Sequence, residues 1–294
     1  MPIPLPALRS LDDEDRALFA RQGFLIKERV LEQDWIDRLR GVFPRLFRGD
    51  FDTGVYPDEW HWREGVSLPD VTRHMANAWK SDLAVAALAL SEDIGRAATT
   101  LTGWPGAKLG QDTIWWKPPG CKAGTFHQDT AFMDFLVPAK TLTCWFTLDD
   151  THRDAGTLEY VAGSHLWPLA DIPGDFLSPE DYRRPMCRAA RAAGCAHPRI
   201  VPIEVPAGSC VLHAGEIWHG SGPNRSGALM RRSIGIHLIP QHAVFSDRPG
   251  GGYIYRRYQR TGSDRLDESF FPLLHARDRS PTDWIRRYCT AGRR

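Results

Sequence analysis

Three short β-rich runs separated by turns lie in residues 199–239, which read RIVPIEVPAGSCVLHAGEIWHGSGPNRSGALMRRSIGIHLI. Each run is rich in Val, Ile or Leu, and Pro206-Ala207-Gly208 supplies the turn between the first two. Further runs of the same kind precede them, so that the full set is 110–117, 140–148, 157–162, 199–205, 209–213 and 230–239. Because no helical pattern separates these runs, the spacing predicts an antiparallel sandwich or barrel.

The segment before this region is helical by pattern. Asp12 and Asp13 stand where helix caps belong, and apolar residues recur at helical spacing on both sides of a break at Gly23. Residues 83–102 give a second helical run. We therefore expect residues 1–105 to be mainly helical.

A polar insert rich in Arg and Pro interrupts the β region at residues 169–198. An insert of this length inside a compact domain favours a lid or a binding loop over a simple connection. The tail of the chain shows no clear period. The expected organisation is one domain over 1–294, mainly β with flanking helices, with a β core at 106–240 and a C-terminal extension at 241–294.

The composition excludes several classes of function. The chain has 37 Lys and Arg against 36 Asp and Glu, a formal charge of +1, so no nucleic-acid partner is expected. No basic start precedes an apolar run, and no stretch approaches the ~20 apolar residues that cross a bilayer, so no membrane location is expected. Six cysteines without a C-x-x-C pair argue against a zinc knuckle and a disulfide framework. These features favour a cytoplasmic protein.

The first candidate for chemistry is Gly124-Thr125-Phe126-His127-Gln128-Asp129. On a strand, residues i and i+2 face the same side with Cα atoms about 6.6 Å apart, so His127 and Asp129 can converge on one ion. An imidazole and a carboxylate suit a borderline divalent metal, and one more His would complete a 2-His-1-carboxylate triad. The pattern alone is unspecific, because His152-Arg153-Asp154 repeats it in a polar turn that reads as a solvated loop.

A third ligand is offered by His219, which follows His127 by 92 residues and lies near the end of a predicted short strand. This separation suits antiparallel strands that meet across a barrel. His213 is the rival candidate, and a core histidine bonded to the backbone is an equally good interpretation of it.

The last β run opens with two guanidinium groups, Arg231 and Arg232. Alternation places Arg231 with Ser233, Gly235 and His237 on a small, polar face that would line a cavity. A buried Arg is costly unless it meets a carboxylate, which its planar fork binds bidentately. The alternative is a surface Arg231 in a salt bridge.

Several motifs follow one another in an order typical of a known family. They are Lys117-Pro118-Pro119-Gly120, His127-Gln128-Asp129, Gly156-Thr157-Leu158, Val161-Ala162-Gly163-Ser164-His165, His219-Gly220-Ser221-Gly222-Pro223-Asn224-Arg225-Ser226 and Arg231. In this order they resemble the phytanoyl-CoA dioxygenase family, whose members are iron(II)- and 2-oxoglutarate-dependent oxygenases built on a double-stranded β-helix, a cupin-like jelly roll. The resemblance covers most of the chain, from Gln22-Gly23-Phe24-Leu25 onward, and is weakest over 170–198 and in the tail.

The resemblance implies that His127, Asp129 and His219 are the catalytic iron ligands. Relatives that halogenate carry a small residue at the position of Asp129, which leaves a place for chloride. The carboxylate here therefore favours hydroxylation, or a related desaturation or ring closure, over halogenation.

The resemblance also implies residues that hold the co-substrate 2-oxoglutarate: Arg231 for its distal carboxylate, with Ser221, Trp145, Gln111 and Thr113 around it. For Gln111 and Thr113, a polar residue on an outward face is an equally good interpretation. In the family the Arg usually comes one residue sooner after the distal His, which leaves Arg232 as an alternative to Arg231. Strand alternation favours Arg231.

The function implied is an oxidation, dependent on iron(II), 2-oxoglutarate and O2, of an unactivated C–H bond in a small organic molecule of secondary or lipid metabolism. The substrate channel is expected to be lined by Trp115, Trp116, Phe132, Asp134, His165 and parts of 169–198 and 250–258, with core packing as the alternative at each position. A cupin-like metalloprotein without oxygenase activity, an isomerase or a ligand-binding barrel, is the competing hypothesis. It needs the metal ligands but not Arg231.

Overall fold

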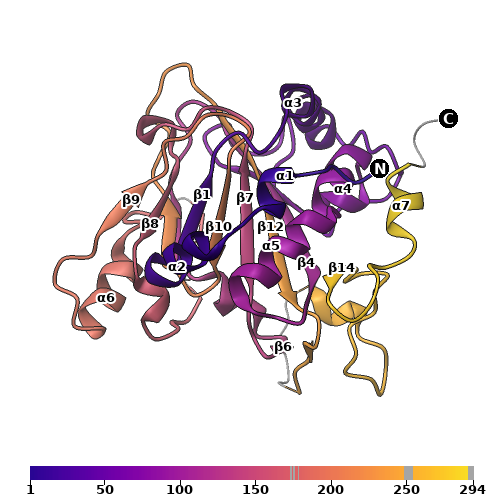
Figure 1. The fold of residues 1–294 in the computed structure, drawn as a ribbon. Coiled ribbons are helices and arrows are strands. Elements are labelled where there is room, and N and C mark those ends of the chain that lie inside the picture. The colour runs from indigo at the N-terminus through magenta and orange to yellow at the C-terminus, as the bar shows by residue number, and fades with distance from the viewer. Residues whose placement is uncertain (173, 175, 178, 248–253, 291–294) are drawn as a thin grey trace.

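Two antiparallel sheets form the centre of the molecule (Figure 1). The computed structural model describes residues 1–294 apart from 173, 175, 178, 248–253 and 291–294. The larger sheet has the strand order β1 (Phe24–Lys27), β10 (Cys210–Ala214), β7 (Leu142–Thr147), β12 (Arg231–Pro240), β4 (Gly106–Lys117), β3 (Arg73–Ala76) and β2 (Glu59–Trp60), with β14 (Leu273–Ala276) also paired to β4. The smaller sheet has the order β5 (Gly124–His127), β11 (His219–Ser221), β8 (Leu158–Val161) and β9 (Ile200–Pro202), and β6 (Leu136–Val137) pairs with β13 (Val244–Phe245).

The helices flank these sheets, as expected for the predicted fold class. They are α1 (Pro6–Arg9), α2 (Asp13–Gln22), α3 (Gln33–Phe47), α4 (Leu83–Ala89), α5 (Glu92–Thr102), α6 (Arg184–Ala192) and α7 (Ile285–Tyr288). Each of the six β runs predicted from the sequence overlaps a strand. The mainly β class with flanking helices is therefore confirmed.

Strand β12 shows how the larger sheet separates a helical core from a cavity. Ile234 and Ile236 are fully buried in one apolar cluster with side chains of α3, α4 and α5. Because successive side chains of a strand point to opposite faces, Arg231 and Gly235 face the other way and line a cavity between the sheets. The face predicted for Arg231 is the one observed.

The first third of the chain contains strands that the sequence did not predict. Helix α2 begins with a capping box at Asp12, as expected, and ends at Gly23, whose φ of +84° favours glycine. The apolar residues after Gly23 are strand β1, not a continuation of the helix. Likewise the predicted helix at 83–102 is two helices, and Ser91 stands at the N-cap of the second. Apolar spacing alone therefore does not separate strand β1 from the helix before it, nor α4 from α5.

The insert at 169–198 lies against the smaller sheet. Helix α6 within it packs Met186 and Ala190 against Phe126. The backbone N–H groups of Thr125 and Phe126 donate to the carbonyls of Phe176 and Tyr182 at 3.0 and 2.8 Å. The insert thus runs beside β5, the strand that carries His127.

All six cysteines are free, as their scattered spacing predicted. No helix within the described ranges combines the length and the apolar character that crossing a bilayer requires.

Candidate metal and co-substrate site

Two imidazoles and one carboxylate meet where β5 and β11 pair. His127 ends β5 and lies directly opposite His219, the first residue of β11. Asp129 Oδ1 lies 3.3 Å from His127 Nε2 and 3.5 Å from His219 Nε2. One donor atom from each of the three residues lies within 4.8 Å of the others, as a shared ion requires.

The local backbone differs from the predicted strand geometry. β5 ends at His127, and Asp129 begins a 3-10 helix that runs to Met133. A turn of the chain, not strand alternation, therefore brings Asp129 to the histidines. His219 likewise starts its strand and does not end it.

Both histidines present the same nitrogen to the centre. The Nδ1 of His127 lies 2.9 Å from the carbonyl of Thr125, and the Nδ1 of His219 lies 3.1 Å from the carbonyl of Ile217. A carbonyl only accepts, so each Nδ1 carries the proton and each Nε2 keeps its lone pair for a metal. Burial lowers the pKa of His219 well below its usual value, which keeps that ring neutral.

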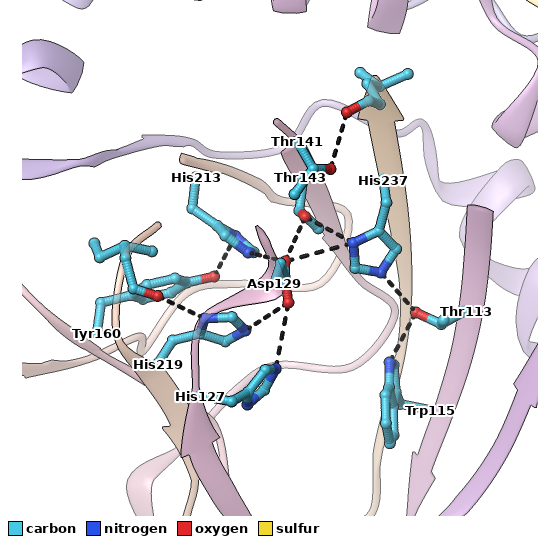
Figure 2. A network of polar contacts seen from close by, with 12 residues as sticks. Thr113, Trp115, His127, Asp129, Thr141, Thr143, Tyr160, His213, His219 and His237 are labelled. Carbon is cyan, nitrogen blue, oxygen red and sulfur yellow. Dashed lines mark hydrogen bonds and ion pairs between the residues drawn. The ribbon is translucent and has the colours of Figure 1, made fainter. Parts of the chain in front are cut away.

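The second oxygen of Asp129 is held from behind (Figure 2). Thr143 Oγ1 donates to Oδ2 at 2.6 Å, and His213 Nε2 lies 3.0 Å from it. Oδ1 is therefore the oxygen left to face an ion.

His213 is the residue that the sequence offers as an alternative to His219 for the third metal ligand. Its Nδ1 lies 2.8 Å from the hydroxyl of Tyr160, and its Nε2 contacts Asp129 (Figure 2). It is buried, but its partners are side chains and not the backbone. It contacts Oδ2 of the carboxylate, whereas His127 and His219 lie near Oδ1.

A cavity lies beside these ligands. Its walls include residues of β4, β7, β11 and β12 and of the 169–198 insert. Among the residues expected around a co-substrate, Arg231, Ser221, Trp145 and Thr113 line it. Gln111 instead accepts a hydrogen bond from the hydroxyl of Tyr255 in the C-terminal extension.

Two buried cations stand side by side in this cavity. Arg231 is 3% exposed and pairs across β12 and β4 with Lys117, which is 1% exposed. Among the described residues neither forms an ion pair, and the Nε of Arg231 has no hydrogen-bond partner. Lys117 Nζ donates to Ser221 Oγ at 2.8 Å and to the carbonyl of Gly222 at 2.5 Å. Burial lowers the pKa of Lys117 to about 7 and that of Arg231 to about 10.

Unpaired buried charge is costly, so this arrangement fits an anion that would lie against both cations. The guanidinium of Arg231 also lies 5.7 Å from the ring centre of Trp145. Arg232, the alternative anchor, faces away: its NH2 group lies 2.6 Å from Asp149 Oδ1. The geometry therefore leaves Arg231 as the guanidinium available to the cavity.

The residues expected to touch substrate are only partly brought together. Trp115 lines the cavity, and Phe132 packs its ring edge against His127, with ring centres 5.7 Å apart. Phe176 of the insert lines the cavity too, 4.8 Å from the ring centre of His127. Phe176 was not singled out from the sequence, although the insert that carries it was expected to act as a lid.

Trp116 and His165 were expected to line the substrate channel, but neither is among the residues that line the cavity. Trp116 follows Trp115 on one strand, so it faces the helical core, where it packs against Phe43 and Phe47. His165 Nε2 lies 3.1 Å from the carbonyl of Ala20 in α2.

Asp134 follows the 3-10 helix, and its carbonyl accepts from Ser246. Of the segment 250–258, residues 250–253 lie outside the described residues.

Two more polar residues line the cavity: His237, which strand alternation placed on this face, and Thr143, which the sequence did not single out. Thr143 and His237 join Asp129 to Thr113 and Trp115 through a chain of contacts (Figure 2). The same alternation predicts the position of Thr143, since it precedes Trp145 by two residues.

Gly220 separates His219 from Ser221 and has no room for a side chain. A Cβ there would lie 2.5 Å from Phe126 Cδ2 and 3.0 Å from Phe126 Cα. A Gly220→Ala variant is therefore expected to lose about 1–3 kcal/mol of unfolding free energy in urea titrations. Gly227→Ala, where a Cβ would meet nothing within 4 Å, is the matched control and should stay within about 0.5 kcal/mol of the parent. Equal stabilities of the two variants would contradict this packing argument.

Comparisons with known proteins agree with this geometry. The profile of the phytanoyl-CoA dioxygenase (PhyH) family matches residues 19–233. Dioxygenase trt7 of Aspergillus terreus (strain NIH 2624 / FGSC A1156) is 26% identical over 185 residues, which cover 58% of this chain and 55% of trt7. Dioxygenase cdmD of Talaromyces verruculosus is 26% identical over 253 residues, 78% of this chain and 72% of cdmD. The match therefore spans little more than half of trt7.

Solved structures show the same fold. The non-heme alpha ketoglutarate dependent carbocyclase SnoK from nogalamycin biosynthesis has a TM-score of 0.69 at 22% identity, covering 94% of this chain and 100% of SnoK. The epimerase SnoN in complex with Fe3+, alpha ketoglutarate and nogalamycin RO has a TM-score of 0.68 at 22% identity, covering 90% of this chain and 98% of SnoN. The double-stranded β-helix, or jelly roll, predicted from the sequence is thereby confirmed.

Proposed function

Because this chain belongs to the phytanoyl-CoA dioxygenase family, we propose that it is an iron(II)- and 2-oxoglutarate-dependent dioxygenase that oxidises an unactivated C–H bond of a small organic molecule. The observation that carries the proposal is the position of the three metal-binding side chains beside two buried cations that lack carboxylate partners among the described residues. A metal alone would not require those cations. A metal together with a dicarboxylate requires both features.

The donor set fits iron(II). Two imidazole nitrogens and one carboxylate oxygen leave positions open for a co-substrate and O2. Bound iron would supply, with 2-oxoglutarate, the activation of O2 that C–H oxidation needs. His127, Asp129 and His219 would hold it, with Thr143 and His213 fixing the carboxylate from behind.

The other end of the cavity fits the distal carboxylate of 2-oxoglutarate. Arg231 offers its guanidinium. The hydroxyl of Ser221 donates to the carbonyl of Gly156 at 2.8 Å and accepts from Lys117, so it holds the ammonium group of Lys117 in place. Trp145 covers the guanidinium and keeps water from it. These residues bind and orient the co-substrate, and none of them needs to act as an acid or a base.

Substrate would approach across an aromatic wall formed by Trp115, Phe132 and Phe176, which stand close together beside His127. Their rings would place an apolar part of the substrate near the metal and exclude water from it. We therefore propose a partly apolar organic substrate that undergoes hydroxylation, desaturation or ring closure. The aromatic wall and the natural-product ligand of SnoN support this class.

An anaerobic titration tests the proposal. Iron(II) and 2-oxoglutarate added to the protein should produce the weak visible charge-transfer band of a chelated keto acid, and admission of O2 with substrate should release succinate. Metal binding without the band and without succinate would contradict the proposal and favour the metalloprotein without oxygenase activity.

Lys117 should make co-substrate binding dependent on pH. With a pKa of about 7, Lys117 is charged at pH 6 and neutral at pH 9. A bound carboxylate favours the charged form, so it raises this pKa, and binding takes up about half a proton at pH 7. Affinity for 2-oxoglutarate should therefore fall as the pH rises above 7.

Calorimetry of 2-oxoglutarate binding to Mn(II)-loaded protein, in buffers of different ionisation enthalpy, counts these protons. A Lys117→Met variant should bind 2-oxoglutarate more weakly at pH 6 and show no proton uptake. Uptake that persists in the variant would show that another group is titrating.

A further inference from the structure

A second group of metal-binding side chains lies at the edge of the larger sheet. β2 and β3 pair antiparallel, and the N–H of His61, just past the end of β2, donates to the carbonyl of His74 at 3.0 Å. His61 and His74 are therefore directly opposite each other and face the same side. Glu59 shares that side with His61, since the two are separated by one residue.

These three side chains are close enough to share an ion. One donor atom from each lies within 4.8 Å of the others. Glu59 Oε1 is 3.1 Å from His61 Nε2, and the rings of His61 and His74 are stacked with centres 5.3 Å apart. None of the three belongs to the site already described.

His74 has a buried polar atom that none of the described residues satisfies. The residue is 8% exposed, and its Nε2 has no hydrogen-bond partner within the part of the chain that the structure describes. Such an atom in a folded protein requires an explanation, and an unrecorded ion is one. Burial also lowers the pKa of His74 to about 3, so the ring is neutral and has a lone pair to offer.

The sheet register connects this group to the main cavity. His74 lies opposite Trp115, and their ring centres are 4.1 Å apart. Trp115 lines the cavity, so Glu59, His61 and His74 continue its inner wall toward the last strand of the sheet.

We propose that Glu59, His61 and His74 form a second site for a borderline divalent cation such as zinc, the outer metal site. Two imidazoles and a carboxylate are ligands that zinc accepts. The side chain of His61 is 42% exposed, so the bound ion keeps room for water and His61 has freedom to close the ligand distances. An ion there fixes the His74 ring against Trp115 and stiffens that wall of the cavity.

Counting zinc ions tests the outer metal site. Chelator-treated protein is dialysed against zinc, and bound metal is measured by atomic absorption. The parent should bind two equivalents, Asp129→Asn should keep one strong site, and His61→Ala should keep one, with affinity at the lost site reduced at least about tenfold. His152→Ala, a change at another exposed histidine, should still bind two.

A double variant, Asp129→Asn with His61→Ala, should bind no zinc tightly. Glu59→Gln, which keeps the size of the side chain, gives the same test if His61→Ala unfolds. A parent that binds only one equivalent, or a double variant that still binds one, overturns the proposal. The measurement uses no turnover, so failure of the proposed dioxygenase activity would leave its result intact.

Discussion

Substituting asparagine for Asp129 is expected to abolish turnover and to weaken metal binding at the main site by more than about 100-fold, since even partners that only orient a ligand cost 10–100-fold. Asp129 is the only carboxylate in the group of three, and its Oδ1 faces both Nε2 atoms. Asparagine keeps the shape but removes the negative charge that an iron(II) ion requires from this site. Calorimetric titration with Co(II) and succinate formation with iron(II) measure the two effects.

Asp154→Asn is the matched control for this experiment. Asp154 belongs to His152-Arg153-Asp154, the second copy of the same sequence pattern, and lies in an exposed 3-10 turn. It should bind metal and turn over as the parent does. If Asp129→Asn kept both the number of bound metal ions and the parental affinity for each, the three residues would not form the main metal site.

Replacing Arg231 with methionine is expected to raise the KM for 2-oxoglutarate while leaving metal affinity nearly unchanged. Breaking one partner of a buried ion pair costs about 3–5 kcal/mol, or roughly 10²- to 4 × 10³-fold in affinity. Arg231 is 3% exposed and faces the cavity, so its carboxylate contact would be shielded from water. Succinate formation at increasing 2-oxoglutarate gives KM, and Co(II) titration gives the metal affinity.

Arg232→Met is a control one residue away. Its guanidinium and its backbone N–H both bond to Asp149 on the opposite face of β12. The change should leave the KM for 2-oxoglutarate within about twofold and lower stability by about 1–3 kcal/mol through the lost charged hydrogen bonds. A larger KM effect at Arg232 than at Arg231 would reverse the assignment.

Strand periodicity explains which cavity residues could be predicted from the sequence. The long strands β4 and β12 carry enough alternating residues to reveal their two faces, which is why Arg231 could be assigned to the cavity. The same rule permits only one of Trp115 and Trp116 to face it, and the structure selects Trp115.

The short strands show no readable alternation of side chains. β2 has two residues and β3 has four, so neither shows a period, and the meeting of His61 with His74 depends on pairing between segments distant in sequence. The position of His165 depends on the docking of α2, which no local pattern encodes. Lys117 belongs to a motif visible in the sequence, but its burial beside Arg231 follows from the register of β4 with β12.

The pairing of β4 has a consequence for shortened forms of the protein. One edge of this strand is covered by β12, while the other is shared between β14 near Gly106 and β3 near Trp116. Strands from the N-terminal, central and C-terminal parts of the chain, β3, β12 and β14, therefore all pair with β4, and β4 supplies Lys117 to the cavity. Removing the N-terminal segment with β3, or the C-terminal segment with β14, would leave part of one edge of β4 without backbone hydrogen bonds. Both terminal segments therefore stabilise this strand.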